Sequence, residues 1–257
     1  MTARVDSGAA PILEIVGLGK SYGETLALSD VSLKFRSGTV HAILGENGCG
    51  KSTLVKLLSG IVAPSSGSIR ILDSSTIGRS PAEIQRVGLA TVFQEVLLAP
   101  DRSVTDNILL GTGSLFTRRA PRTTRNALAA SALAQVTTVS IDLDAPAGEL
   151  SLAAGQLVVL ARALVRAPKI LVLDEATAAL DLADREAVFQ MIEGHARSGG
   201  LVLFISHRMD EVLRLAHQVT ILRNGRVVET LDTHKTTAEA LLALMAPAAA
   251  QELGHVF

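Results

Sequence analysis

The sequence has one cysteine, one tyrosine, no tryptophan and only 3% aromatic residues among its 257 residues. A single cysteine, Cys49, excludes an internal disulfide framework, and the opening MTARVDSGAAP lacks the apolar segment of a secretory signal. Neither sign of charge is in excess, because 24 Lys and Arg face 25 Asp and Glu. The longest uncharged stretch, residues 126–141, carries Ser, Gln and Thr throughout and is too short to span a bilayer. These absences predict a cytoplasmic protein that does not bind nucleic acid and that reaches a membrane only through a partner.

The residues that are present indicate a buried α/β core. Hydrophobic residues make up 48% of the chain, and its length is sufficient for one large domain. Residues 169–173 and 201–205 are apolar almost throughout, which is typical of parallel strands covered by helices on both faces. Strands are predicted at residues 31–35, 39–44, 68–72, 89–93, 170–173, 201–205 and 219–223.

The helical pattern is concentrated in the middle of the chain. An Ala- and Leu-rich region from Val104 to Arg166 predicts an inserted α-helical subdomain, with approximate limits 95–166. Asn224-Gly225 predicts a two-residue hairpin and therefore an antiparallel β edge on a mostly parallel sheet. We expect one domain over residues 12–246, with a last helix at 236–245. A disordered segment is expected at 1–11 and a tail at 247–257.

One segment has the pattern G-x-x-x-x-G-K-[ST]: Gly45-Glu-Asn-Gly-Cys-Gly-Lys51-Ser52. It follows a predicted strand and precedes a helical run at 53–58, which is the context of a phosphate-binding loop (P-loop). Backbone N–H groups of such a loop bind phosphates, the lysine reaches the β- and γ-phosphates, and the serine hydroxyl binds Mg²⁺. The predicted nucleotide-binding residues here are Gly45, Glu46, Asn47, Gly48, Cys49, Gly50, Lys51, Ser52 and Thr53.

Two carboxylates follow another apolar strand, in Ile170-Leu-Val-Leu-Asp174-Glu175. Ligands of open α/β sheets bind at this end of the strands. Asp174 is predicted to hold Mg²⁺, and Glu175 to polarise the water that attacks the γ-phosphate. The two acids could also simply cap a strand, but the P-loop upstream favours the functional interpretation. Together the motifs predict a P-loop NTPase core.

Further elements follow in the order found in ATP-binding cassette (ABC) ATPases, and the chain resembles that family over residues 12–245. Gln94 follows a strand, as the Q-loop glutamine does. Residues 150–156, LSLAAGQ, stand where the family has its LSGGQ signature. Asp181 in Ala-Leu-Asp resembles the D-loop, and His207 in ISHRMDE resembles the switch histidine.

This resemblance implies roles for the matching residues. Gln94 would touch Mg²⁺ and the attacking water beside a transporter-coupling groove, and His207 would donate to the γ-phosphate. The signature, with Ser151 and Gln156, would approach the γ-phosphate from an opposite subunit. Tyr22 precedes Gly23 where the family stacks an aromatic ring on adenine. The implied catalytic residues are Glu175, His207 and Gln94. The further nucleotide-binding residues are Tyr22, Ser151, Gln156 and Asp181, the metal ligands are Ser52, Gln94 and Asp174, and the cofactors are ATP and Mg²⁺.

Several of these residues have plainer interpretations. Ser151 could be a helix N-cap, and Gln94 and His207 could be a surface glutamine and a turn histidine. Tyr22 could belong to the core or the surface. Cys49 could be a reactive thiolate near a helix N-terminus or an inert, buried side chain, with neither interpretation favoured. The basic cluster Arg118, Arg119, Arg122 and Arg125 could contact a permease, but an ordinary solvated face is favoured.

The sequence also departs from the family pattern. Leu152 and Ala153 replace the signature glycines, and Ala176 follows Glu175 where most members have proline. A Cβ at the signature would crowd the approach to the phosphate without removing the N–H group. ATPases of ribose/xylose/galactose-type importers also carry altered signatures, and HAILGENG, GLATVFQE and SVTDNILLG resemble them. Those proteins usually carry two cassettes in one chain, so a second cassette is expected here from elsewhere.

The function implied is an ATP hydrolase coupled to transmembrane transport: the ATPase subunit of an ABC importer for a monosaccharide. The implied partners are transmembrane permease subunits, a second cassette in a homodimer or heterodimer and, indirectly, an extracytoplasmic substrate-binding protein. The implied location is the cytoplasmic face of the inner membrane. The alternatives left open are ATPases for nucleoside, amino acid or export transporters, a catalytically impaired regulatory cassette, and an ABC ATPase acting on DNA or the ribosome. The last is disfavoured because the chain lacks coiled-coil arms and tandem cassettes.

Overall fold

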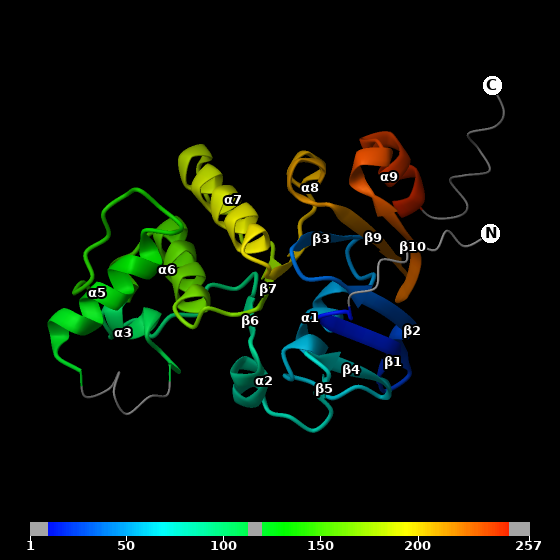
Figure 1. Ribbon diagram of the computed structural model, residues 1–257, viewed down its shortest axis with the longest axis horizontal. Coiled ribbons are helices and arrows are strands. Elements are labelled where there is room, and N and C mark those ends of the chain that lie inside the picture. Colours follow the sequence, from blue (N-terminus) through cyan, green and yellow to red (C-terminus); the bar gives the residue numbers. More distant parts are fainter. Residues whose placement is uncertain (1–9, 113–119, 247–257) are drawn as a thin grey trace.

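The computed structural model describes residues 10–112 and 120–246 (Figure 1). The predicted segments 1–11 and 247–257 therefore lie outside the described residues, except for Ala10 and Pro11. Arg118 and Arg119 of the predicted basic cluster lie outside them as well. Within this part of the chain, no helix is both long enough and apolar enough to cross a bilayer.

A six-stranded sheet forms the centre of the molecule, with strand order β10-β9-β3-β8-β7-β6. Strands β9, β3, β8, β7 and β6 run parallel, and β10 pairs antiparallel with β9. The predicted hairpin is confirmed: Asn224 and Gly225 form the two-residue turn, and both have positive φ, 49° and 72°. The strands are β3 (Thr39–Leu44), β6 (Leu89–Val92), β7 (Ile170–Asp174), β8 (Leu201–Ile205), β9 (Gln218–Arg223) and β10 (Arg226–Asp232).

Both faces of β7 and β8 are buried, as the apolar runs predicted. Alternate residues of β7 and β8 enter two different hydrophobic cores, so Leu171 and Leu173 lie in one and Ile170 and Val172 in the other. Helices α7 (Leu182–Arg197), α8 (Met209–Leu215) and α9 (Ala238–Met245) contribute to the first core. Helix α1 (Lys51–Leu58) contributes to the second. In Figure 1 the helices α7, α8 and α9 lie above the sheet.

A second, wholly antiparallel sheet has the order β2-β1-β4-β5 and packs into the same core as α1. The predicted strands 31–35 and 68–72 belong to this sheet, which the sequence did not distinguish from the first. β1 was not predicted at all, because register shifts after Ile15 and Leu18 interrupt its period-two pattern. The strands are β1 (Leu13–Tyr22), β2 (Thr25–Phe35), β4 (Ser66–Ile71) and β5 (Ser74–Ser75).

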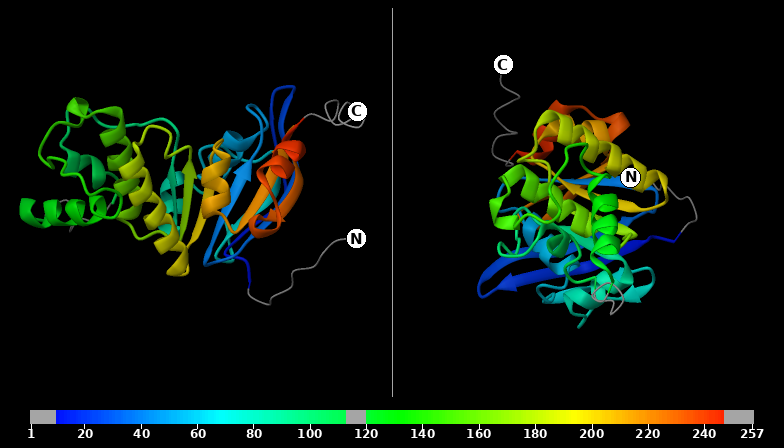
Figure 2. Two further views of the ribbon diagram at one scale, coloured as in Figure 1. Left: turned by 90° about the horizontal axis from the view of Figure 1, so that it is seen from above. Right: turned by 90° about the vertical axis from the view of Figure 1, so that its left-hand side faces the viewer.

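The helical insert is confirmed as a separate group of elements, which projects away from both sheets (Figure 2, left). It contains α3 (Val104–Ile108), α5 (Arg122–Leu133), a 3₁₀ turn at Ala147–Glu149 and α6 (Leu152–Leu164). α2 (Pro81–Val87) precedes β6, and another 3₁₀ turn, Thr233–Lys235, precedes α9. The insert therefore meets the six-stranded sheet along α6, which packs on both α5 and β6.

Candidate functional site

The phosphate-loop motif joins the end of β3 directly to the start of α1. A Cβ on Gly45 would lie 2.2 Å from the carbonyl oxygen of Leu222, and one on Gly50 would lie 2.7 Å from that of Ala27. Gly50 also has φ 110°, a conformation that a residue with a side chain rarely adopts. Glycine is required at both positions because the loop passes too close to β2 and β9 for any other residue.

Neighbouring backbone holds this loop in place. The N–H of Gly225 donates to the carbonyl of Cys49 at 2.9 Å, so the β9–β10 turn is hydrogen-bonded to the loop. Lys51 Nζ crosses the loop and donates to the carbonyl oxygens of Gly45 at 2.6 Å and Glu46 at 2.9 Å. The thiol of Cys49 is 5% exposed and packs in a hydrophobic core, which favours the buried, inert interpretation of this residue.

Ten of the predicted site residues line one cavity of about 580 Å³ at the carboxyl ends of β3, β7 and β8. The cavity therefore joins segments that are far apart in the sequence, as expected for parallel strands. Ala27 of β2 also lines it, and no sequence pattern pointed to this residue. The ten are Asn47, Gly48, Gly50, Lys51, Ser52, Thr53, Gln94, Asp174, Glu175 and His207.

Glu175 stands between the other two predicted catalytic side chains. Gln94 Nε2 donates to its Oε2 at 3.2 Å, and His207 Nδ1 lies 3.4 Å from its Oε1. The backbone of Glu175 has φ 51°, which is uncommon for a residue with a side chain, and its N–H donates to the carbonyl of Ile205 at 2.9 Å. The strained backbone and these contacts fix the carboxylate in the wall of the cavity.

Asp174 carries the clearest electrostatic perturbation in the site. It is 6% exposed at the end of β7, and burial, with the neighbouring charge of Glu175, raises its pKa to about 6. Lys51 opposes this shift from across the loop. Two adjacent carboxylates facing a lysine and a serine hydroxyl form a set of hard oxygen donors suited to a divalent cation.

The structure does not bring the remaining predicted residues to this cavity. Tyr22 is 45% exposed at the end of β1, where Lys20 Nζ lies 5.1 Å from the ring centroid. Ser151 and Asp181 are the N-caps of α6 and α7, and their side chains accept from the N–H groups of Ala154 and Asp184. The contact of Ser151 matches its plainer interpretation as a helix N-cap.

Gln156, which the resemblance placed in the signature that approaches the γ-phosphate of an opposite subunit, is buried in this chain. Its side chain is 3% exposed, and its Nε2 has no hydrogen-bond partner among the described residues. This burial favours a packing role within the helical insert. In contrast, Leu152 in the first turn of α6 is 67% exposed. Where the family has a signature glycine, this chain therefore presents an apolar side chain to solvent.

The described arginines of the basic cluster pair locally. Arg122 forms an ion pair with Asp144 at 2.6 Å, and Arg125 forms one with Asp106. Both acids belong to the helical insert. The Arg122 side chain is 73% exposed, as expected of a solvated face, whereas that of Arg125 is 28% exposed and its Nε is buried.

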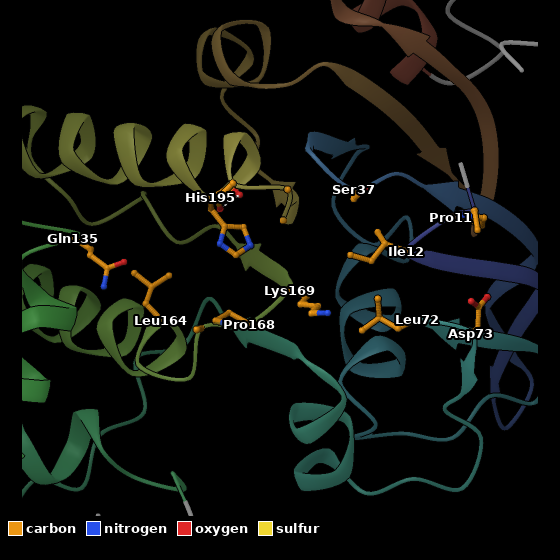
Figure 3. A pocket seen from close by; sticks show the side chains of 15 residues that line it. Pro11, Ile12, Ser37, Leu72, Asp73, Gln135, Leu164, Pro168, Lys169 and His195 are labelled. Carbon is orange, nitrogen blue, oxygen red and sulfur yellow. Dashed lines mark hydrogen bonds between the residues drawn. The ribbon is translucent and has the colours of Figure 1, made fainter. Parts of the chain in front are cut away.

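A larger cavity, about 720 Å³, lies at the amino ends of the parallel strands (Figure 3). His195 and Gln135 lie on one side of it and Ile12 on the other, with Lys169 between them. None of the predicted catalytic, nucleotide-binding or metal-binding residues lines this cavity.

Comparison with known proteins identifies the family. The family model described as ABC transporter matches residues 28–178, from β2 through the end of β7 to the segment after Glu175. The chain belongs to the ABC transporter family. The predicted resemblance is thus confirmed, and the α/β fold with its antiparallel sheet is that of an ABC cassette ATPase.

Curated relatives of this cassette are import ATPases. It is 40% identical over 236 residues to the ribose import ATP-binding protein RbsA 1 of Rhizobium johnstonii, covering 91% of this chain and 46% of that protein. It is 36% identical over 234 residues to the arabinose import ATP-binding protein AraG of Yersinia pestis, covering 90% and 44%. The chain thus spans a little less than half the length of these relatives.

Solved structures of ABC cassettes have the same fold. A nucleotide-free ATP-binding cassette from an ABC transporter is 26% identical with a TM-score of 0.77, covering 95% of this chain and 98% of that one. A cassette in its ADP conformation is also 26% identical, with a TM-score of 0.75 and coverage of 97% and 100%. The agreement extends over almost the whole cassette, including its helical insert.

Proposed function

We propose that this cassette hydrolyses Mg-ATP to drive a sugar importer. The observation that carries the proposal is the Glu175 carboxylate, held between Gln94 and His207 in the cavity that the P-loop also lines. A carboxylate in this position can accept a proton from an attacking water. Gln94 would orient that water, and His207 would donate a hydrogen bond to the γ-phosphate as negative charge develops on it.

Lys51, Ser52 and Asp174 have the chemistry to bind the nucleotide and its metal ion. Mg²⁺ is usually held by one or two carboxylates together with substrate phosphates and water. Asp174, Ser52 and Gln94 would hold it here, and the ion would neutralise charge on the β- and γ-phosphates. Because a cation beside Asp174 favours its charged form, the raised pKa of this group would fall when the metal binds.

A second surface fits the proposed permease partner. A cavity of about 200 Å³ lies between β6 and α6, next to Gln94 in the sequence. Leu97 and Leu110 line it and are 66% and 55% exposed, while Glu95 and Arg166 supply charge. Exposed apolar side chains rimmed by charge are typical of a protein contact site. A permease loop docked here would sense the position of Gln94 and, through it, the state of the nucleotide.

The sugar assignment rests on the names of the relatives. Their curated functions are ribose and arabinose import, and this cassette matches slightly less than half of each. We infer that it pairs with a second cassette, which is either another copy or a different chain. Together the two would act on a pair of permease subunits from the cytoplasmic face of the inner membrane, supplied by an extracytoplasmic binding protein.

Uptake of labelled solutes tests this proposal. Cells that lack the gene should take up labelled ribose, arabinose or galactose more slowly, and the wild-type gene should restore the rate while Glu175→Gln should not. Asp73→Asn is the matched control, because Asp73 lines the opposite cavity. Loss of nucleoside or amino acid uptake instead, with sugar uptake unchanged, would reassign the substrate. If the Glu175→Gln gene restored sugar uptake, hydrolysis at Glu175 would not drive the transport, and this part of the proposal would be wrong.

A further inference from the structure

Glu211 is a buried carboxylate that the mechanism above does not use. It lies in the first turn of α8 and is 1% exposed. A buried charge is costly unless hydrogen bonds and opposite charges compensate it, so its partners are informative.

The hydrogen bonds of Glu211 reach the loops that carry both catalytic side chains. Its Oε2 accepts from the hydroxyl of Thr177 at 2.9 Å and from that of Ser206 at 3.1 Å. Thr177 is two residues after Glu175, and Ser206 directly precedes His207. One carboxylate oxygen therefore joins the segment after β7 to the segment after β8.

The second oxygen of Glu211 completes this arrangement. Its Oε1 accepts from Arg208 Nη1 at 3.1 Å, and Arg185 Nη1 of α7 lies 3.8 Å away. The Ser206 hydroxyl also accepts from the N–H of Arg208 at 3.1 Å, so the residues on both sides of His207 are tied to the same acid. The carboxylate is thus compensated by two hydroxyl groups and two guanidinium groups.

We propose that Glu211 is a positioning residue that sets the distance between His207 and Glu175. This inference rests on the function proposed above. The imidazole is 64% exposed, and among the described residues the contact that holds its ring is the 3.4 Å approach to Glu175. Its backbone anchors therefore decide where the ring lies. Small displacements of catalytic groups cost large factors in rate without equal effects on substrate binding.

Three variants test the proposal by separating turnover from binding. In Glu211→Gln the side-chain volume is kept, but an NH₂ group must face either the hydroxyl donors or the guanidinium groups. We expect kcat for ATP hydrolysis to fall by about 100-fold and KM to change by less than about threefold. Thr177→Val removes one hydroxyl with little change of shape and should lower kcat by about tenfold. Thr177→Ser keeps a hydroxyl donor and should restore the rate.

A buried threonine elsewhere provides the matched control. Thr220 in β9 is 0% exposed and bonds His41 through its hydroxyl at 2.7 Å, away from the loops after β7 and β8. Thr220→Val also removes a buried hydroxyl bond, so it reports the cost of such a loss in general. Its kcat per folded molecule should match the wild type. Equal kcat values for Thr177→Val and Thr220→Val would overturn the positioning role.

Hydrogen exchange provides a readout that does not depend on hydrolysis. In Glu211→Gln and Thr177→Val, amides of residues 203–210 should exchange at least about tenfold faster than in the wild type and in Thr220→Val. Unchanged exchange in this peptide would overturn the proposal even if activity fell. Failure of the proposed function would appear differently: the wild type would hydrolyse ATP no faster than Glu175→Gln, while the exchange results would still decide whether Glu211 holds the loops.

Discussion

The two ends of the parallel sheet carry cavities of similar size but different chemistry. At the carboxyl ends of the strands, the 580 Å³ cavity gathers a lysine, two carboxylates, a glutamine and a histidine from four segments. At the amino ends, the 720 Å³ cavity is larger, but its charged side chains, Asp73 and Lys169, belong to different elements and form no ion pair with each other in the described structure (Figure 3). Convergence of charge, and not volume, is the reason why we propose the site at the carboxyl end.

The titratable groups at the two ends also differ. Asp174 at the carboxyl end has a raised pKa because it is buried beside another carboxylate. His41, near the amino end of β3, has a pKa lowered to about 4 because its ring is buried. The ring packs edge-on against Phe35 and shares a hydrogen bond with Thr220. Asp174 lines the proposed nucleotide cavity, while His41 stays neutral inside the core. Perturbation alone therefore does not identify a site.

The largest expected difference between the two ends is catalytic. Glu175→Gln should lower ATP turnover by at least about 100-fold, because the amide cannot accept the proton of water, while nucleotide affinity changes by less than about threefold. Asp73→Asn should leave turnover unchanged. With excess Mg-ATP, light scattering of Glu175→Gln should detect a stable dimer, formed with a partner cassette if one is required. Equal ATP turnover in Glu175→Gln and Asp73→Asn would contradict the catalytic difference between the two ends of the sheet.

The second prediction concerns acid sensitivity at the amino end. Because burial lowers the pKa of His41 from its ordinary value of 6.5 to about 4 in the folded chain, only the unfolded chain binds the extra proton between these pH values. The free energy of unfolding should thus fall by up to about 3 kcal/mol as the pH drops from 6.5 to 4. His41→Gln should lose this component. Urea unfolding at pH 7 and pH 4.5 measures it, and an identical pH dependence in both proteins would contradict it.

The third prediction has the opposite sign and concerns the carboxyl end. The folded chain binds more protons than the unfolded chain between pH 3.8 and about 6, so the contribution of Asp174 to stability falls as the pH rises through this range. Asp174→Asn should unfold about 3–6 °C higher at pH 8, a gain of ~1.5 kcal/mol after allowance for solvent screening.

Thermal melts of Asp174→Asn at two pH values are the measurement. The gain should disappear below about pH 4, where the wild-type carboxyl is protonated as well. Asp73→Asn should give no gain at either pH. A gain of equal size at pH 4 and pH 8 would show that charge is not its cause.

The smallest effect is expected at the altered signature, which lies outside both cavities. The double substitution Leu152→Gly and Ala153→Gly removes both side chains from the first turn of α6. If these side chains crowd the approach of a second cassette, ATP turnover should rise by about twofold. Ala238→Gly, at the first position of α9, controls for the helix cost of glycine. Unchanged or lower turnover in a folded double variant would refute the crowding idea.

The sequence predicted the parts of the site that lie in continuous motifs. Lys51 and Ser52 follow glycines whose positions the backbone requires, and Asp174 and Glu175 end an apolar strand. Such motifs are visible because local geometry and chemistry are set within a few residues. The sequence did not predict β1, whose register shifts break the alternation of side chains. It also assigned Glu211 no role, although the residue stands within ISHRMDE, because burial cannot be seen in a short motif.

The sequence by itself therefore determined the phosphate loop, the apolar parallel strands and the order of motifs that identifies the ABC family. These depend on residue type and spacing along the chain. Only the tertiary structure decided that Gln94 and His207 meet at Glu175, that Gln156 is buried, and that Thr177 and Ser206 share one acid. Most of these contacts join segments separated by tens of residues, as Gln94 to Glu175 and Thr177 to Glu211 do, and their geometry exists only when the strands are aligned and the helices pack on them.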